Sequence, residues 1–252
     1  EGAKRAAEIA VSGFHNLLLI GPPGTGKTML ARRLPTIMPG LGFEEKLELT
    51  RIYSIAGLLS REHPLIDERP FRSPHHTSTP QAIAGGGRNP RPGEITLAHK
   101  GVLFLDEMPE FARGSLEVLR QPLEDKQIQL SRASGTYVFP AGFILVAAMN
   151  PCPCGYYPDM NKCRCTPGEV SHYLHKLSQP LLERIDLCAD VPPVNFSQIS
   201  GEKSGESSAL IRKRVEKARR IQQKRYQNEK ICFNGELSGK QIRKYCVLTE
   251  NA

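Results

Sequence analysis

Residues 21–28 read Gly21-Pro22-Pro23-Gly24-Thr25-Gly26-Lys27-Thr28, and this stretch decides the fold of the 252-residue chain. It satisfies the G-x-x-x-x-G-K-[ST] pattern of a phosphate-binding loop. An apolar run at 16–20 before it predicts a buried strand, and residues 28–38 after it have a helical pattern. A chance glycine-rich turn is the alternative, which these two flanks disfavour. Glycines let backbone N–H groups point inward around phosphates, and a helix N-terminus adds its positive end. We therefore expect the loop to bind ATP, with Lys27 reaching the β- and γ-phosphates and the Thr28 hydroxyl binding Mg²⁺.

Two further apolar runs supply the rest of the expected site. Residues 102–105 predict a buried strand, which is followed by Asp106 and Glu107. We expect Asp106 to hold the water shell of the metal and Glu107 to act as the general base on the attacking water. Asn150 ends a third predicted strand at 143–148, where its amide is placed to touch the γ-phosphate and the lytic water. A turn-forming asparagine is the alternative. Together the three elements predict hydrolysis of a nucleoside triphosphate.

Short apolar runs alternate with helical patterns along the first 194 residues, which predicts a largely parallel sheet with helices on both faces. Residues 64–100 are rich in Pro, Gly and His, and we expect an irregular insertion there with at most one short strand near Phe71. After residue 193 the composition turns to Ser, Gly and charged side chains, so we place a domain boundary at 194. The other expected elements are helices at 3–13, 44–59, 115–124 (ended early by Pro122) and 206–228, hairpin arms at 127–130 and 135–140, and a strand at 185–191.

The net charge is +8, from 34 Lys and Arg against 26 Asp and Glu. Residues 201–230 alone hold ten basic and four acidic side chains, a surplus of six. Such a stripe fits a polyanionic partner, and the alternative is a solvated helix face. No apolar run approaches the roughly 18 residues that cross a bilayer, so we expect no membrane partner.

Four of the seven cysteines crowd into a loop at 151–167, namely Cys152, Cys154, Cys163 and Cys165. An odd number crowded in this way is not typical of a secreted disulfide framework, so we expect a reducing, cytoplasmic location. Four thiols fit the tetrahedral ligand set of a structural Zn²⁺ ion, although C-x-C is tighter than the usual spacing. Unligated cysteines and disulfides are the alternatives. His75 and His76 are not expected to share a metal, because adjacent strand residues point to opposite faces.

Longer motifs extend the pattern beyond the phosphate loop. They are FRSPHHT at 71–77, GGG at 85–87, PGEI at 92–95, LFLDEMPEF at 103–111, LRQPLED at 119–125 and AAMNPCPCG at 147–155. In these motifs the chain resembles AAA+ ATPases of the magnesium-chelatase-like family, and within that family the ComM/YifB type. The resemblance runs from about Ala3 to at least Arg225, so we expect a fragment that covers the AAA+ module.

The resemblance implies an α/β fold, a P-loop NTPase of the AAA+ type with its core at 1–194 and an incomplete helical lid at 195–252. The segment at 64–100 would be an insertion shared with minichromosome-maintenance helicases. The hairpin around 127–140 would point into the central pore of a ring. Full members of the family also have an N-terminal domain and a sensor 2 segment after the lid. Neither is recognised in this sequence, so no sensor 2 residue is assigned.

The resemblance also implies roles for two residues. Asn150 would be sensor 1. Arg184, in the segment LLERID at 181–186, would be the arginine finger that acts on the nucleotide of a neighbouring subunit. From the residues alone, a salt bridge from Arg184 to Asp186 or Glu183 is the alternative.

The implied function is a hexameric, ATP-driven motor on DNA, a helicase or branch-migration enzyme linked to natural transformation and recombination. The residues themselves support DNA through the net charge, the stripe at 201–230, and Lys126 and Arg132 on the predicted hairpin, whose phosphate contacts would be salt-sensitive. One alternative is a protein-remodelling ATPase like the motor subunit of magnesium chelatase. Another is a nucleotide-dependent scaffold, against which the presence of Glu107 argues.

Overall fold

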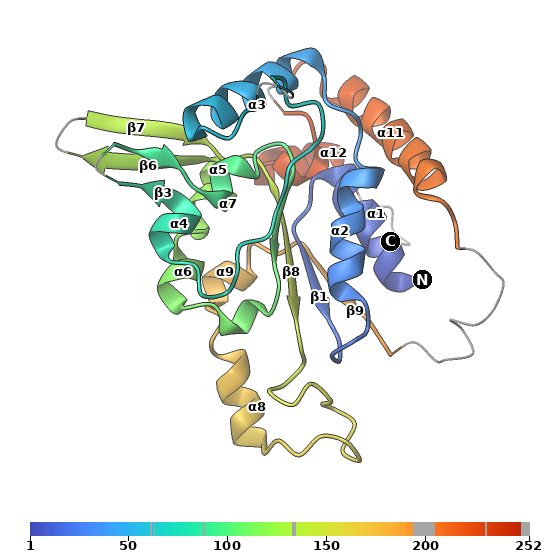
Figure 1. Cartoon of the computed structure of the whole chain (residues 1–252). Helices are drawn as coiled ribbons and strands as arrows, with labels where there is room; N and C mark the ends of the chain where they lie inside the picture. Colours follow the sequence, from blue (N-terminus) through green and yellow to red (C-terminus); the bar gives the residue numbers. More distant parts are fainter. Residues whose placement is uncertain are drawn as a thin grey trace.

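The computed structural model describes residues 1–60, 62, 64–87, 89–132, 135–193, 205–229 and 231–247 of the chain. Its centre is a parallel sheet with the strand order β2-β5-β8-β1-β9 (Figure 1). The strands are β1 (Leu17–Ile20), β2 (Phe71–Arg72), β5 (Val102–Leu105), β8 (Ile144–Met149) and β9 (Leu187–Asp190). The predicted parallel sheet and its buried strands are thereby confirmed.

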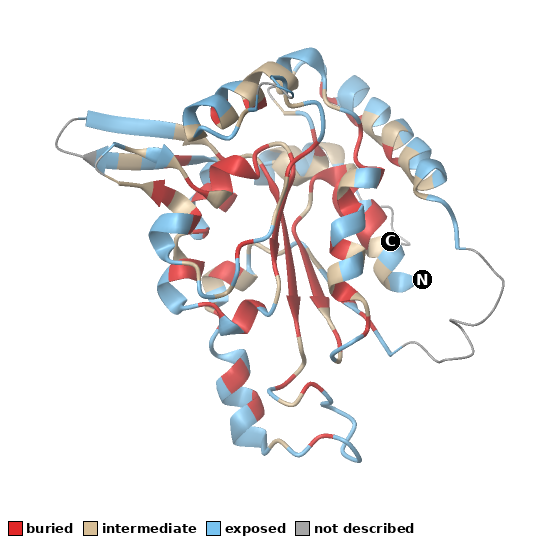
Figure 2. Cartoon of the chain, viewed as in Figure 1, coloured by how far each residue is buried: buried red, intermediate tan, exposed pale blue. Residues whose placement is uncertain are grey.

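Both faces of this sheet are buried, because successive side chains of a strand point to opposite sides. Leu18, Leu103 and Leu145 belong to one core cluster. Leu17 and Phe104 belong to a second cluster on the other face. Every residue of β8 is buried, as the red central strand in Figure 2 shows. A strand covered on both sides needs apolar residues at every position, which explains the uninterrupted apolar runs in the sequence.

Helices cover both faces of the sheet. One face carries α1 (Gly2–Gly13), α2 (Lys27–Ile37) and α11 (Ser208–Arg225). The other carries α5 (Glu94–Leu97), the 3₁₀ helix η1 (Met108–Glu110), α6 (Arg113–Glu117), α7 (Arg120–Asp125) and α9 (Gln179–Leu182). Further helices in the described part of the chain are α3 (Phe43–Ala56), α8 (Pro167–Leu174), the 3₁₀ helix η2 (Asn234–Glu236) and α12 (Gly239–Tyr245). The helices predicted at 3–13, 28–38, 44–59 and 206–228 are confirmed to within a few residues at each end.

The insertion at 64–100 is more regular than its composition predicts. Besides β2 and α5 it contains α4 (Pro80–Ala84) and an antiparallel pair formed by β3 (Gly85–Gly86) and β4 (Arg91–Pro92). The expectation of at most one short strand was therefore wrong. The backbones at Gly85 and Gly93 approach so closely that a Cβ atom on Gly93 would lie 2.2 Å from the Gly85 nitrogen. In the sequence these glycines indicate a loop, but in the structure they allow two backbone segments to pack closely.

The helix predicted at 115–124 is in fact two short helices, α6 and α7. Pro122 lies inside α7 instead of ending it, so this expectation was also wrong. Arg120 is the first residue of α7, which makes Pro122 the third. Proline is tolerated there because the first N–H groups of a helix have no partner within the helix.

The predicted hairpin is confirmed as β6 (Gln127–Arg132) paired with β7 (Gly135–Pro140), and it projects from the body of the molecule (Figure 1). Lys126 lies at its base, half-buried, where it ends α7 in a left-handed conformation (φ 55°). Burial lowers the pKa of Lys126, and the nearby Glu236 and Asp186 carboxylates oppose this shift. Lys126 is thus not placed at the tip, while the side chain of Arg132 lies outside the described residues.

Candidate functional site

The predicted phosphate-binding loop, residues 21–28, connects β1 to α2 at the carboxyl edge of the sheet. Gly24 and Gly26 have positive φ angles of 74° and 85°, which residues with a side chain rarely adopt. Lys27 begins α2 and is buried, with 8 % of its surface exposed. Its Nζ donates hydrogen bonds to the Gly21 oxygen at 2.6 Å and the Pro22 oxygen at 2.8 Å. Neutral backbone oxygens therefore hold the ammonium group inside the loop. A phosphate bound in the loop would offer this group charged oxygen acceptors instead.

Asn150 completes the ring of contacts around Lys27. Its Oδ1 accepts a hydrogen bond from Lys27 Nζ at 3.2 Å. β1 and β8 are parallel neighbours, so the loop after β1 and the residue after β8 meet at the same edge. Burial lowers the pKa of Lys27, and the Asp106 and Glu107 carboxylates oppose that shift. The structure thus brings together the predicted phosphate-binding lysine and the predicted sensor.

Asp106 follows β5 and contacts the first turn of α2. The Thr28 hydroxyl donates to Asp106 Oδ2 at 2.7 Å, and the Glu107 backbone N–H donates to Asp106 Oδ1 at 3.0 Å. A hydroxyl and a carboxylate are oxygen ligands of the kind that Mg²⁺ prefers. The pair therefore fits the expected metal, with Thr28 and Asp106 as the residues that would hold it.

A cleft of about 410 Å³ surrounds these groups. It is lined by the loop, by both carboxylates and by Asn150: Pro23, Gly24, Thr25, Gly26, Lys27, Thr28, Met29, Asp106, Glu107, Met149 and Asn150. A larger, mainly apolar cavity of about 900 Å³ adjoins it and shares Thr25, Gly26 and Met29 with it. That cavity is lined by residues of α1, α2 and α11 and by Pro192 and Pro193. A polar cleft beside an apolar cavity suits a phosphate chain joined to a flat base.

His76 contacts the predicted general base, a relationship that the sequence reasoning missed. His76 Nδ1 lies 3.7 Å from Glu107 Oε2, and the two side chains are 33 % and 60 % exposed. His75 and His76 follow β2 instead of lying on a strand, and their ring centroids are only 4.1 Å apart. The argument that they point to opposite faces was therefore wrong. The His75-His76 pair itself was the available signal, and it does not indicate Glu107 as a partner.

Arg184 lies away from the phosphate loop of its own chain. Its backbone oxygen accepts a hydrogen bond from Asn16 Nδ2 at 2.7 Å, just before β1 begins. The phosphate loop follows the other end of β1, about 13 Å away at roughly 3.3 Å per residue. Arg184 Nη2 pairs with Glu124 Oε2 at 2.7 Å. The ion pair is thus with Glu124, not with the sequence neighbours considered as alternatives.

The four clustered cysteines converge. Their Sγ atoms all lie within 4.8 Å of one another, with 3.4 Å between Cys152 and Cys154, 3.8 Å between Cys152 and Cys163, and 3.6 Å between Cys154 and Cys163. All four are free thiols. Hydrogen bonds from the backbone of Tyr156 and Arg164 lower the pKa of Cys154 to about 6, which favours a thiolate. The cluster is therefore compatible with a tetrahedral metal site.

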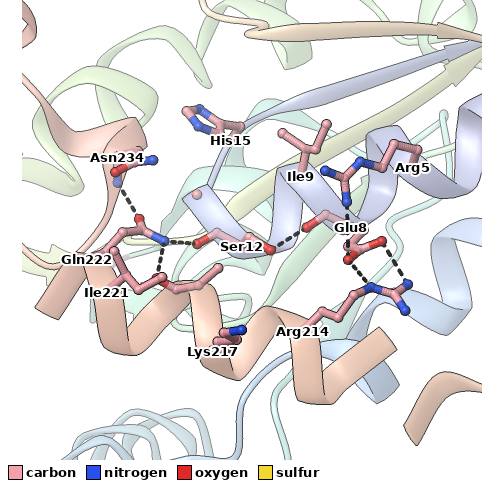
Figure 3. Close-up of a pocket in the computed structure, with 12 residues that line it drawn as sticks. Arg5, Glu8, Ile9, Ser12, His15, Arg214, Lys217, Ile221, Gln222 and Asn234 are labelled. Carbon is pink, nitrogen blue, oxygen red and sulfur yellow. Dashed lines mark hydrogen bonds and ion pairs between the residues drawn. The ribbon is translucent and has the colours of Figure 1, made fainter. Parts of the chain in front are cut away.

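The basic stripe of the sequence lies largely on α11, which packs against α1 (Figure 3). Arg214 pairs with Glu8 at 2.7 Å, and Gln222 Nε2 donates to the Ser12 oxygen at 2.8 Å. Arg212 and Arg219 also have acidic partners, Glu216 and Glu45. An exposed row remains without an acidic partner among the described residues: Lys213, Lys217, Arg220 and Lys224. Their spacing of four, three and four places them on one face of the helix. Residues 201–204 and 230 of the stripe lie outside the described part of the chain.

None of the helices in the described part of the chain combines the length and apolar character that a bilayer crossing requires.

Comparisons with known proteins agree with this geometry. The family model "Magnesium chelatase, subunit ChlI" matches residues 1–199, and that of the ChlI C-terminal region matches residues 205–252. YifB from Salmonella typhimurium is 49 % identical over 251 residues, which cover 98 % of this chain and 48 % of that protein. The competence protein ComM from Haemophilus influenzae is 46 % identical over 250 residues, with the same two coverages. The chain spans about half the length of the curated relatives it matches. It belongs to the magnesium-chelatase-like family of AAA+ ATPases, within the group that contains YifB and ComM.

Proposed function

We propose that this chain binds and hydrolyses ATP as the AAA+ module of a motor that acts on DNA. The observation that carries the ATPase proposal is the convergence of four groups on one cleft. Lys27 is held within hydrogen-bonding distance of Asn150, and Thr28 is bonded to Asp106. Each group comes from the carboxyl edge of a parallel sheet, where such folds bind ligands.

Each residue has a defined role in the proposed reaction. Lys27 and the backbone N–H groups of residues 24–28 bind the phosphates, while Thr28 and Asp106 hold Mg²⁺. The metal supplies positive charge beside the β- and γ-phosphates. Glu107, exposed at the mouth of the cleft, accepts a proton from the attacking water, and Asn150 orients that water and the γ-phosphate. The apolar cavity between α1, α2 and α11 takes the base, so α11 forms one wall of the nucleoside site, as part of the lid expected at 195–252.

Arg184 is proposed as an arginine finger that acts on a neighbouring subunit. Because it lies at the amino edge of the sheet, it does not reach the cleft of its own chain. Arg184 of one subunit must then reach the cleft of a neighbouring subunit, and the same contact must repeat from each subunit to the next. Such a head-to-tail contact closes into a ring, for which we propose six subunits.

The proposed track is DNA, contacted without regard to sequence. The unpaired row on α11 offers four exposed cations on one helix face, which suits a phosphate backbone better than a carboxylate surface of mixed charge. The name of the relative ComM refers to competence, which accords with a role in DNA uptake or recombination. Helicase or branch-migration activity would make use of the projecting hairpin β6–β7. A reducing cytoplasmic location suits the seven free thiols.

We further propose that Cys152, Cys154, Cys163 and Cys165 bind one Zn²⁺ ion. A tetrahedron of sulfur atoms at about 2.3 Å from zinc has edges of about 3.8 Å, close to the observed separations. Residues 156–162 between the two cysteine pairs are all exposed, so the side chains of this segment contribute no apolar burial that would order it. A metal cross-link would supply the missing constraint.

The experiment that tests the motor is ATP hydrolysis by the full-length protein with and without DNA, over a salt series. Glu107→Gln should bind ATP and be inactive. The paired change Lys217→Gln and Arg220→Gln should reduce the slope of log affinity against log salt by about 2, because each lost phosphate contact removes about 0.9. The matched control is Lys240→Gln with Arg243→Gln, which removes two exposed cations from α12.

The outcomes separate the candidate functions. Hydrolysis that DNA stimulates supports the DNA motor. Hydrolysis that is indifferent to nucleic acid but stimulated by a protein partner supports the alternative, a protein-remodelling ATPase like the motor subunit of magnesium chelatase. That alternative is favoured by the family match itself.

A further inference from the structure

The loop that carries the four cysteines is joined to the phosphate site at three points. It begins directly after Asn150, whose side chain contacts Lys27. The segment of chain that leaves the cluster passes through Thr166 into α8. Thr166 caps that helix by accepting a hydrogen bond from the Glu169 backbone N–H at 3.3 Å, and the Glu169 carboxylate accepts one from the Thr166 backbone N–H at 2.8 Å. Both ends of the loop are therefore fixed to defined structure.

The second point of contact is Gly155. Its φ angle is 87°, and a Cβ atom at this position would lie 2.6 Å from Cδ of Pro23 and 3.7 Å from Cγ of Asn150. The loop is thus packed directly on the phosphate-binding loop, closely enough that only glycine fits. Gly155 N–H also donates to Cys152 Sγ at 3.2 Å, so the residue that touches Pro23 is itself tied to a cluster sulfur.

The third point is Tyr173, which lies near the end of α8, the helix that follows the cysteine cluster. It is buried, with 6 % of its surface exposed. Burial raises the pKa of Tyr173 to about 12, although a hydrogen bond from the backbone of Asn150 opposes the shift. The Tyr173 hydroxyl thus lies beside the backbone of Asn150, which places α8 next to the residue after which the cysteine loop begins.

Backbone hydrogen bonds such as that from Cys163 N–H to the Asp159 oxygen at 2.7 Å shape the loop locally, but its apolar contacts are few. Cys152, Cys163 and Val170 are the buried members of the small apolar cluster here, with Cys154 and Cys165 at its margin. Three small side chains of this kind bury too little apolar surface to order an exposed loop. Without a cross-link between the cysteines, the few apolar contacts of the loop would have to keep Gly155 in contact with Pro23.

We infer that Zn²⁺ bound by the four cysteines acts as a brace of the nucleotide site, fixing Asn150 and pressing Gly155 against Pro23. The inference rests on the proposed ATP binding. It predicts that metal content and nucleotide affinity are coupled, even though no cysteine touches the nucleotide cleft. Gly155 and Tyr173 are then positioning residues: Gly155 acts on nucleotide affinity through Pro23 of the phosphate-binding loop, and Tyr173 acts on catalysis through Asn150.

The test uses the full-length protein, its zinc content by elemental analysis and its affinity for a fluorescent ATP analogue. Wild type and the control Cys232→Ser, an exposed cysteine outside the cluster, should hold one zinc per chain. Chelation of the zinc, or Cys163→Ser, should weaken nucleotide binding about tenfold, and added Zn²⁺ should restore it in the chelated wild type.

A second variant keeps the inference testable if Cys163→Ser does not fold. Gly155→Ala retains all four thiols, so it should still hold one zinc per chain, yet it should bind nucleotide about tenfold more weakly because its methyl group strikes Pro23. Absence of zinc from wild type overturns the inference, as does zinc whose removal leaves nucleotide affinity unchanged. Failure of wild-type protein with zinc to bind the analogue would instead refute the proposed ATP binding.

Discussion

The Nζ atom of Lys27 lies 3.2 Å from the Oδ1 atom of Asn150, 123 positions further along the chain. The contact joins two loops at the carboxyl edge of the sheet, because β1 and β8 are hydrogen-bonded parallel neighbours. Lys27 also has the Gly21 and Pro22 oxygens as acceptors, whereas the amide of Asn150 faces the cleft. The lysine should therefore bind nucleotide without Asn150, while catalysis should need both.

We accordingly predict that Asn150→Ala lowers kcat about 10²-fold while changing nucleotide affinity little, as expected when a polar group that stabilises the transition state is removed. Steady-state hydrolysis and equilibrium binding of an ATP analogue measure the two effects. Asn228→Ala, an exposed position after α11, is the control. An equal loss of affinity and kcat would show that Asn150 only supports the loop.

His76 should position the general base. The imidazole lies 3.7 Å from Glu107 Oε2 and stands edge-on to Phe111, with ring centroids 6.4 Å apart. Removing it leaves Glu107 free to rotate, so His76→Ala should lower kcat about tenfold and change the pH profile of kcat, with KM unchanged. His76→Gln, which retains a hydrogen-bonding group, should recover part of the loss. His172→Ala on α8 is the control, and a rise in KM alone would contradict the assignment.

Arg184 gives a prediction that depends on assembly. It pairs with Glu124 in the isolated chain, and its side chain is 35 % exposed, so it is available to a neighbour. Arg184→Ala should lower kcat about 10³-fold and leave nucleotide binding intact. Mixing this variant with Glu107→Gln should restore some activity, because a mixed ring contains clefts with a wild-type Glu107 facing a wild-type Arg184. Activity no greater than that of the separate variants would rule out action in trans.

The sequence predicts well which residues gather at the cleft, because these residues lie in short segments that match a strict pattern. Eight adjacent residues define the phosphate loop, and Asp106, Glu107 and Asn150 each follow an apolar strand. Contacts that depend on tertiary packing were not predictable in the same way. Arg184 pairs with Glu124 across 60 positions, and His76 contacts Glu107 from the segment that follows β2, without any sequence pattern that links either pair. Apart from the strand near Phe71, the short helices and strands within residues 64–100 were not predicted, because glycines occur both in loops and where two backbone segments pack closely.

The docking of α11 on α1 gives a prediction about pH. A hydrogen bond from Arg214 is the largest of the effects that lower the pKa of Glu8 from its usual 4.5, and the carboxylate is nearly buried between the helices (Figure 3). A carboxyl whose pKa is lowered on folding stabilises the native state above the unfolded pKa, and that contribution is lost as the pH falls through the folded pKa. The thermal midpoint of wild type should therefore drop between pH 5 and pH 3.

Glu8→Gln removes the titrating group, so its thermal midpoint should be lower than that of wild type at pH 7 and should fall less on acidification. Differential scanning calorimetry at several pH values measures both effects. Glu44→Gln, at an exposed position in the first turn of α3, should follow the wild-type curve. If Glu8→Gln and Glu44→Gln give the same dependence on pH, the ion pair between Glu8 and Arg214 does not contribute to the attachment of α11. The stability of that helix would then come from its apolar contacts, of which Val215 is the fully buried example.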